Sequence, residues 1–379
     1  MIIAFAAAAA ILILVNLISI IIAGWRMMRS GKPAPLVEER PPVSIVVPTR
    51  GIEPFAVETL ARAFALDWPD YELIFCVANP RDPVIAEIRR AMAANPGVPA
   101  RILTGDDRIS ANPKLNNCVK GWKAARHDWV ILADSNVLMP KDYVAHLMAS
   151  WHKNTGLVCS TPIGTRPEGF WAEVECMFLN TQQARWQYAG EAIGFGFAQG
   201  KSMLWFRPLL DDNGGIEALA AEIAEDAAAT KLVNRLGYKV HLVSSPFDQP
   251  LGRRTRHDVW SRQARWARLR RVTFPLFFAP EILLGALPPL LFAVAAAVLA
   301  GVNAPAIAAA VVAAIYLPEL ALGLAKGWRV SLLSLPAILV RDIMLPLVWI
   351  RSWGNGAVVW RGNAMTIDTK ACELEEVTQ

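Results

Sequence analysis

The chain has 379 residues, of which 54% are hydrophobic, and a formal net charge of +5. This length suits one soluble domain with a few membrane-spanning segments. The 5 cysteines show no CxxC spacing and the 5 histidines form no HxxxH or HExxH pair, which argues against a zinc site. The positive charge is concentrated between Arg253 and Arg271, beside an apolar block. That position favours anionic lipid headgroups and phosphates as partners, and no nucleic acid is expected.

The first predicted element is a membrane anchor at residues 1–25. Residues 2–23 carry no charge and are long enough to cross a bilayer. A cleaved signal peptide is the alternative, but a basic region before the apolar stretch and a small-x-small cleavage site after it are both missing. Arg26, Arg29 and Lys32 follow the apolar stretch, so the positive-inside rule places the following chain in the cytoplasm. A proline-rich linker at 26–42 comes next.

From residue 43 the pattern alternates between strands and helices. Strands are predicted at 43–48, 71–78, 101–103 and 127–134, and helices at 54–66, 82–94 and 114–125. This alternation predicts an α/β domain with a mostly parallel sheet covered by helices. In such sheets ligands bind beyond the carboxyl ends of the strands. Thr49, Asn79 and Asp134 lie at three such ends, so one shared crevice is expected there.

A possible metal motif follows the apolar run 129–133. Asp134-Ser135-Asn136 has the form of an Asp-x-Asp motif in which the last carboxylate is replaced by an amide. A hard divalent cation prefers oxygen ligands and commonly bridges a protein carboxylate and substrate phosphates. Asp134 and Asn136 are therefore candidate ligands of Mg²⁺ or Mn²⁺, with a diphosphate supplying the remaining charge. The alternative is that Asp134 caps the following helix or turn.

Two further candidates lie at predicted helix starts. Lys114, within Asn112-Pro-Lys-Leu-Asn-Asn117, could meet a phosphate with the help of the helix dipole, or could be a surface lysine beside a plain turn. Asp226 precedes a helical run that stops at Gly237 and is a plausible N-cap. Its carboxylate could also deprotonate an attacking hydroxyl, and one residue can do both.

A basic motif, Arg262-Gln-Ala-Arg265-Trp266, lies just before the second apolar block. A leaving nucleoside diphosphate needs cationic stabilisation, which Arg265 could supply, and Trp266 could line an acceptor site or anchor at the interface. The alternative is the solvated face of a basic amphipathic helix at 253–275. It applies best to Arg268, Arg270 and Arg271, which fit contact with interfacial phosphates.

The second apolar block predicts two transmembrane helices within 276–326, joined by a turn at 301–305. Glu319, near the end of its span, is expected to snorkel or pair. A third apolar stretch, 332–350, lies within the final segment 327–379 and carries Arg341-Asp342 at its centre. It either spans with that pair facing protein or lies at the interface, and the cost of central charges favours the interface.

Five stretches together resemble ceramide glucosyltransferases of glycosyltransferase family 21, within the family 2-like enzymes of the GT-A fold. They are residues 43–48, 112–117, 134–135, 223–226 and 262–266. Asn-Pro-Lys-x-Asn-Asn with Ala-Glu-Asp is the more specific part, because many glycosyltransferases share (Gln/Arg)-x-x-Arg-Trp. Trp360-Arg361-Gly362 also resembles the ceramide branch. The resemblance implies a Rossmann-like GT-A catalytic domain at 43–252, between an N-terminal transmembrane anchor and C-terminal membrane helices.

The resemblance also implies roles for individual residues. Asp134 would be the second of three family aspartates, which binds metal and diphosphate, and Asp226 the third, which is the catalytic base. The first is best matched by Asp82, although Asn79 stands where many relatives have an acid. The terminal motif would be Arg262, Arg265 and Trp266, and substrate contacts are implied for Pro48, Asp82, Lys114, Asn117 and Glu225. Gln183 stands where animal relatives have a histidine, so that histidine's role does not carry over.

The implied reaction is an inverting transfer of a single sugar, glucose in the first instance, from a UDP-sugar to the primary hydroxyl of ceramide, assisted by Mg²⁺ or Mn²⁺. The alternatives are UDP-galactose or UDP-glucuronate as the donor, and a hopanoid or diacylglycerol as the acceptor. A polysaccharide synthase fits less well, because three or four membrane segments are too few to enclose a channel. A non-catalytic scaffold would not need to retain the carboxylates and the basic motif together. The composition suggests a multi-pass protein of a bacterial inner membrane, in contact with membrane lipids, with its catalytic domain in the cytoplasm.

Overall fold

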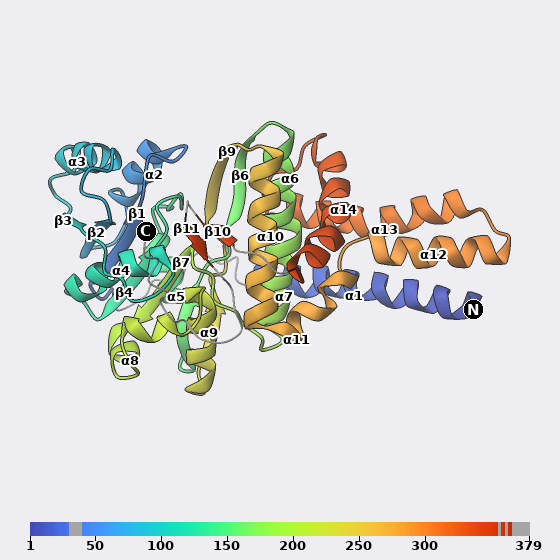
Figure 1. The fold of residues 1–379 in the computed structure, drawn as a ribbon, viewed down its shortest axis with the longest axis horizontal. Helices are drawn as coiled ribbons and strands as arrows, with labels where there is room; N and C mark the ends of the chain where they lie inside the picture. The colour runs from blue at the N-terminus through green and yellow to red at the C-terminus, as the bar shows by residue number, and fades with distance from the viewer. Residues whose placement is uncertain (30–39, 355–357, 361–362, 366–379) are drawn as a thin grey trace. The chain divides into compact units, whose positions relative to one another are not determined.

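The structure is a computed structural model that describes residues 1–29, 40–354, 358–360 and 363–365. Most of the predicted linker 26–42, and Arg361-Gly362 of the C-terminal motif, lie outside the described residues. The described chain divides into two compact units. We call them the sheet unit (Arg29–Pro162 and Gly190–Pro250) and the helical unit (Met1–Met28, Ile163–Ala189 and the described residues from Leu251 on) (Figure 1).

The sheet unit is built on a seven-stranded sheet in the order β3-β2-β1-β4-β7-β5-β8. The strands are β1 (Val43–Thr49), β2 (Tyr71–Val77), β3 (Ala100–Thr104), β4 (Trp129–Ala133), β5 (Thr155–Cys159), β7 (Ser202–Phe206) and β8 (Lys239–Leu242). The pairs β1–β2, β2–β3, β1–β4 and β5–β8 are parallel, whereas β7 runs antiparallel to both β4 and β5. The predicted α/β architecture with a mostly parallel sheet is confirmed.

Helices cover both faces of this sheet, so its central strands are buried and mostly apolar. They are α2 (Ala56–Ala63), α3 (Val84–Ala94), α4 (Pro113–Ala124), α5 (Tyr143–Ala149), α8 (Arg207–Asp211), α9 (Glu225–Arg235) and a 3-10 helix (Ile216–Ala221). On one face, Ile45 and Phe75 join a buried core with Leu60 of α2 and Ile88 of α3. On the other face, α4 packs against β1 and β2.

The helical unit contains the long apolar helices. Its helices are α1 (Ile2–Arg29), α6 (Phe170–Met177), a π-helix (Phe178–Ala184), α7 (Arg185–Ala192, which continues past this unit), α10 (Arg256–Thr273), α11 (Pro275–Phe278), a 3-10 helix (Ala279–Leu283), α12 (Leu287–Ala300), α13 (Ala304–Ala325) and α14 (Ser334–Ser352). β6 (Ile163–Glu168) pairs with β9 (Asp248–Arg253), and β10 (Val358–Trp360) pairs with β11 (Asn363–Met365).

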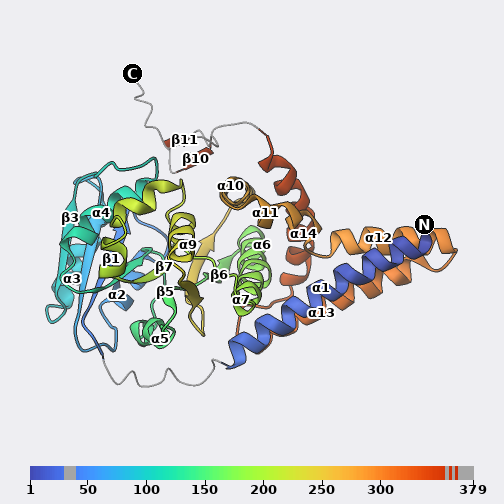
Figure 2. The same cartoon turned by 90° about the horizontal axis from the view of Figure 1, so that it is seen from below.

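Two helices of the described chain are long and apolar enough to cross a membrane, Ile2–Met28 and Ala304–Ala325. The pair Pro275–Leu283 and Leu287–Ala300, bent by 42°, makes a third if it is one span. α1 lies along α12 and α13 (Figure 2), with the rings of Phe5 and Phe292 6.0 Å apart. The turn predicted after α12 is confirmed, because Gly301 ends that helix with a φ of 66°. These apolar helices associate the protein with a membrane.

The charges within the apolar segments face protein. Glu319 of α13 pairs with Arg185 and Arg341 at 2.8 Å each, and all three side chains have an exposed fraction of 0%. Asp342 pairs with Arg341 at 2.6 Å and is also buried. Pairing is thus the outcome for Glu319, rather than snorkelling to the interface. The cost of the Arg341 and Asp342 charges favoured an interfacial position for the stretch 332–350. In the structure both side chains are buried and paired within the protein.

The basic helix α10 departs from the sequence expectation at two of its arginines. Arg268 is buried, and both Nε and Nη2 of Arg270 donate to the Glu281 carboxylate at 2.8 Å. The predicted contact of Arg268 with interfacial phosphates is therefore wrong, because its side chain packs inside the helical unit. Arg271 lies over the ring of Trp353, 5.4 Å from its centroid.

Candidate active site

Asp134 is the centre of the candidate site in the sheet unit, directly after β4. Its Oδ1 lies 2.7 Å from Lys114 Nζ and its Oδ2 lies 2.8 Å from Lys201 Nζ. Burial on its own would raise the pKa of Asp134, but the two ammonium groups outweigh burial and lower the pKa well below its ordinary value. Asp134 is therefore ionised, and its carboxylate is engaged by two cations.

Lys201 is a residue of this site that the sequence analysis missed. It precedes β7, whose antiparallel register places Ser202 opposite Ala133, and the Asp134 N–H donates to the Lys201 carbonyl at 2.9 Å. Lys201 Nζ also donates to Asn136 Oδ1 at 3.0 Å. Lys201 therefore connects both residues of the predicted metal motif. The signal that could have identified it was a strand at 202–206 paired against β4.

Lys114 connects Asp134 to the acidic pair of α9. It lies in the first turn of α4, where the Asn112 side chain caps the helix by accepting from the N–H groups of Lys114 and Leu115. Lys114 Nζ lies 2.7 Å from Glu225 Oε1, and Asn112 Nδ2 donates to Glu225 Oε2 at 2.6 Å. Burial would lower the pKa of Lys114, but the charges of Asp134 and Glu225 raise it above its ordinary value. The lysine is thus a fixed cation.

Asp226 lies next to this cation. α9 begins at Glu225 after Ala224, so Asp226 stands in the first turn and the predicted N-cap role is wrong. Its Oδ2 accepts from the Gly200 N–H at 3.3 Å and its Oδ1 from the Ala227 N–H at 2.8 Å. Burial and then the Glu225 charge raise the pKa of Asp226 to about 6. A carboxylate with such a pKa is suited to accept a proton near neutral pH.

The other predicted contacts of the sheet unit lie in its framework. Asp82 accepts from the Gly51 N–H at 2.9 Å and from the Val84 N–H at 3.0 Å, which ties the loop after β1 to the start of α3. Asn117 is buried, and its Nδ2 donates to the Cys76 carbonyl at 2.6 Å. Pro48 lies in β1 opposite Cys76 of β2. Substrate contact for these three residues stays a prediction.

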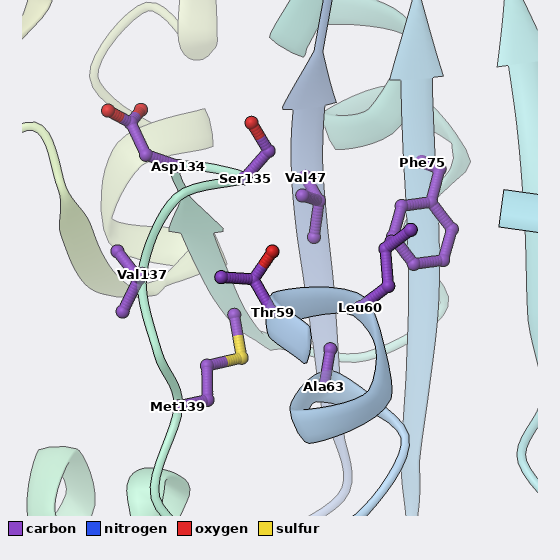
Figure 3. Close-up of a pocket in the computed structure, with 9 residues that line it drawn as sticks. All are labelled: Val47, Thr59, Leu60, Ala63, Phe75, Asp134, Ser135, Val137 and Met139. Atoms are coloured by element: carbon purple, nitrogen blue, oxygen red, sulfur yellow. The ribbon is translucent and has the colours of Figure 1, made fainter. Parts of the chain in front are cut away.

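A small pocket borders the Asp134 loop (Figure 3). Figure 3 shows apolar side chains from β1, α2, β2 and the loop after β4 around it, while the Asp134 carboxylate points away from them. Its lining residues are Val47, Thr59, Leu60, Ala63, Phe75, Asp134, Ser135, Val137 and Met139. The pocket is thus apolar except at its Thr59, Asp134 and Ser135 edge.

The oxygens of Asp134 and Asn136 fit a hard divalent cation. Lys201 Nζ contacts an oxygen of each side chain, so one positive charge can reach both at once. No group of three or more His, Cys, Asp or Glu side chains is placed to hold a metal ion in the part of the chain that the structure describes. A cation here would therefore need its remaining ligands from phosphate oxygens and water, as Mg²⁺ commonly does.

The predicted terminal motif lies on α10 in the helical unit. Arg262 forms an ion pair with Glu175 of α6, a carboxylate with an exposed fraction of 0% that also pairs with Arg254 at 3.1 Å. Arg265 and Trp266 are half-buried on the same helix. Gln183 Nε2 donates to Gln263 Oε1 at 3.1 Å, which joins the π-helix to α10. Arg262 therefore stabilises the α6–α10 packing, and a catalytic role for this motif stays a prediction.

Comparison with known proteins identifies relatives over most of the chain. Ceramide glucosyltransferase 3 of Caenorhabditis elegans is 27% identical over 330 residues, which are 85% of this chain and 72% of the relative. Ceramide glucosyltransferase 1 of the same organism is 27% identical over 273 residues, 72% of this chain and 58% of the relative. Ceramide glucosyltransferase of Komagataella phaffii is 38% identical over 110 residues, 28% of this chain and 22% of the relative.

The fold also matches a solved glycosyltransferase. A mannosyltransferase from Pyrobaculum calidifontis, solved with GDP-Man and Mn²⁺, has a TM-score of 0.54 and 20% identity, and the match covers 92% of this chain and 97% of that one. At this identity the likeness establishes the fold, which is GT-A. The model of the family described as glycosyl transferase family 21 matches residues 9–372. The chain belongs to glycosyltransferase family 21 and is a membrane-associated glycosyltransferase of GT-A fold.

Proposed function

We propose that the chain transfers a single glucose from UDP-glucose to the primary hydroxyl of ceramide, with inversion at the anomeric carbon. The observation that carries this proposal is the pair of 2.7 Å ion pairs from Lys114 to Asp134 and to Glu225. They join the strand-end aspartate to the acidic pair of α9, residues far apart in sequence that the family resemblance assigns to one reaction. The relatives named ceramide glucosyltransferase support the acceptor, and the apolar helices support its delivery from a membrane.

The proposed base is Asp226. As the acceptor oxygen bonds to the anomeric carbon, its proton passes to the Asp226 carboxylate and the bond from that carbon to the diphosphate oxygen breaks. The pKa of about 6 leaves Asp226 mostly ionised at neutral pH while keeping it basic enough to take the proton. Inversion follows from the single in-line displacement.

The charge of the diphosphate is the second requirement of the reaction. Lys114 supplies an ammonium group that ion pairs with Asp134 and Glu225 hold in place, and a cation held in place stabilises charge that develops on a leaving group. Asp134 and Asn136 would hold Mg²⁺ or Mn²⁺, which would neutralise phosphate charge when bound. The family resemblance assigns Arg265 to the leaving diphosphate and Trp266 to the acceptor. The proposed location is a bacterial inner membrane, with the sheet unit in the cytoplasm.

The first experiment is a transfer assay with the full chain in detergent. Ceramide, Mn²⁺ or Mg²⁺ and a panel of UDP-sugars are supplied, and the lipids are read by mass spectrometry. We expect one hexose added to ceramide from UDP-glucose. A hexuronic acid would change the donor to UDP-glucuronate, and UDP release without a ceramide product would move the acceptor to another lipid, such as a hopanoid. The absence of UDP release under every condition would contradict the proposal.

The base assignment is tested by Asp226→Asn. We expect turnover to fall by about 10²-fold or more, because general base catalysis contributes on that order, while UDP-sugar binding stays within a few-fold of the wild type. Asp212→Asn, at an exposed position after α8, is the matched control and should keep full activity. Wild-type turnover in Asp226→Asn would remove Asp226 from the mechanism.

Metal dependence is a separate prediction. Excess EDTA should abolish transfer, and Mn²⁺ or Mg²⁺ should restore it, because phosphate charge is then neutralised again. The measurement is UDP release before and after the cation is added back. Full activity in EDTA would exclude a metal role for Asp134 and Asn136.

A further inference from the structure

Lys201 occupies the position that the proposed function gives to a metal ion. Its ammonium lies 2.8 Å from Asp134 Oδ2 and 3.0 Å from Asn136 Oδ1. These side chains are the two that would hold Mg²⁺ or Mn²⁺. A cation supplied by the protein itself thus already bridges both proposed ligands.

The sheet places Lys201 there. β4 and β7 are antiparallel with Ala133 opposite Ser202, and the Asp134 N–H donates to the Lys201 carbonyl at 2.9 Å. Residues directly opposite each other in such a pair project to the same face, with Cβ atoms about 5 Å apart. The Lys201 ammonium is carried on a flexible four-carbon stem, so rotation of that stem can move the charge without moving the backbone. Position 201 is therefore fixed next to Asp134, while its charge can move.

The two lysines of the site differ in how firmly they are held. Lys114 pairs with two carboxylates, Asp134 and Glu225, at 2.7 Å each. Lys201 pairs with one carboxylate and one amide oxygen. Because fewer negative charges hold the Lys201 ammonium, an arriving cation would displace Lys201 before Lys114.

We propose that Lys201 is an internal, displaceable occupant of the metal position. It holds Asp134 and Asn136 in place while no divalent cation is bound, and it moves aside when the cation and a nucleoside diphosphate arrive. A divalent cation repels the ammonium, whereas phosphate oxygens attract both, so the diphosphate and the cation strengthen each other's binding. The inference rests on the proposed metal role of Asp134 and Asn136 and makes Lys201 a positioning residue of that site.

The test is a Mn²⁺ titration of the full chain in detergent, with and without UDP, in which free Mn²⁺ is measured by electron paramagnetic resonance. Lys201→Met keeps the length of the side chain and removes its charge, and Lys201→Arg keeps the charge. Lys123→Met is the matched control, because Lys123 pairs with Glu217 at 2.9 Å on the surface, away from Asp134. Melting temperatures are recorded for every variant. If Lys201→Met melts lower, Lys201→Gln takes its place in the titration.

The expected result is a change in coupling. In the wild type, UDP should strengthen Mn²⁺ binding by about tenfold or more. In Lys201→Met, Mn²⁺ without UDP should bind about 10- to 100-fold more tightly than to the wild type, the range of affinity changes found when residues around metal ligands are altered. UDP should strengthen Mn²⁺ binding by a smaller factor than in the wild type, because only the direct contact between phosphate and Mn²⁺ then remains. Lys201→Arg and Lys123→Met should behave like the wild type.

Equal Mn²⁺ affinities in the wild type and in the folded Lys201 variant would overturn the inference. So would full wild-type transfer in excess EDTA, because Lys201 would then be a permanent replacement for the metal. Ceramide transfer is measured on the same preparations to separate the two claims. If the Lys201 variant binds Mn²⁺ more tightly but no ceramide product forms, the inference about Lys201 stands and the proposed ceramide acceptor is wrong. If a ceramide product forms but the Mn²⁺ affinities are equal, the proposed acceptor stands and the inference about Lys201 is wrong.

Discussion

At the scale of single residues, the acid limb of the pH profile should report Asp226. Burial and the Glu225 charge raise its pKa to about 6 from the ordinary value of 3.8. A base acts only when deprotonated, so kcat/KM should rise about tenfold per pH unit below about pH 6 and level off above it. The measurement is kcat/KM for the UDP-sugar at saturating ceramide. A profile without an acid limb down to about pH 5 would contradict the assignment of Asp226 as the base.

Glu225 should set the position of that limb. Its carboxylate is the second cause, after burial, of the raised pKa of Asp226, so Glu225→Gln should move the limb to lower pH by roughly one unit. Glu225→Gln also weakens the contact with Lys114 and can lower the maximal rate, but a lower maximal rate does not change the pH at which the acid limb lies. Glu222→Gln, whose carboxylate pairs with Lys231, is the control and should leave the limb in place. An unmoved limb in Glu225→Gln would show that another group titrates there.

The sequence predicted part of this residue-scale arrangement. Lys114 at a helix start and Asp134 at a strand end were recognisable, because caps and apolar runs are local signals. Lys201 was not, because its role depends on β7 entering the sheet antiparallel between β4 and β5, a non-local pairing. The N-cap expectation for Asp226 failed because the N-cap is Ala224, two residues earlier, and helix ends are poorly defined by sequence.

At the scale of elements, the close approach of α4 to the sheet should be sensitive to one methyl group. A Cβ at Gly121 would lie 2.4 Å from Val46 Cγ1 and 2.6 Å from Cys76 Sγ. Gly121→Ala should therefore destabilise the protein by about 1–3 kcal/mol through overpacking, although alanine is the better helix former. The measurement is thermal unfolding in detergent, together with transfer activity, because α4 carries Lys114.

The control for this prediction is Gly97→Ala, where an added Cβ meets no atom within 4 Å. It should leave both the melting temperature and the activity unchanged. Unchanged stability in Gly121→Ala would mean that α4 can shift on the sheet. A loss of activity without a loss of stability would then locate the effect at Lys114.

The elements of the sheet unit were easier to predict than those of the helical unit. The strands predicted at 43–48 and 71–78 match β1 and β2 within a residue, because buried strands between turn residues are a strong local pattern. The π-helix Phe178–Ala184 has no such signal, and its chain segment Ile163–Ala189 lies in the helical unit rather than with the sheet. Packing against distant helices decides that placement.

At the scale of the whole molecule, a buried ionic cluster joins four separate parts of the helical unit. Arg185 of α7 contacts Asn16 of α1 and Glu319 of α13, and Glu319 also pairs with Arg341 of α14. Asp342 balances the second arginine, so the cluster holds two positive and two negative charges. Because charges in an apolar region are tolerated only when paired, the cluster fixes which helices of this unit pack together.

Removing one member should therefore cost more than removing a balanced pair. Glu319→Gln leaves two buried arginines with a single carboxylate and should destabilise the helical unit by about 3–5 kcal/mol. Glu319→Gln combined with Arg185→Gln leaves Arg341 paired with Asp342. The double variant should therefore lose less free energy of unfolding than the two single variants lose together. Glu281→Gln, which breaks the surface pair with Arg270, should cost no more than about 1 kcal/mol. Additive losses in the double variant would show that the four charges do not act as one cluster.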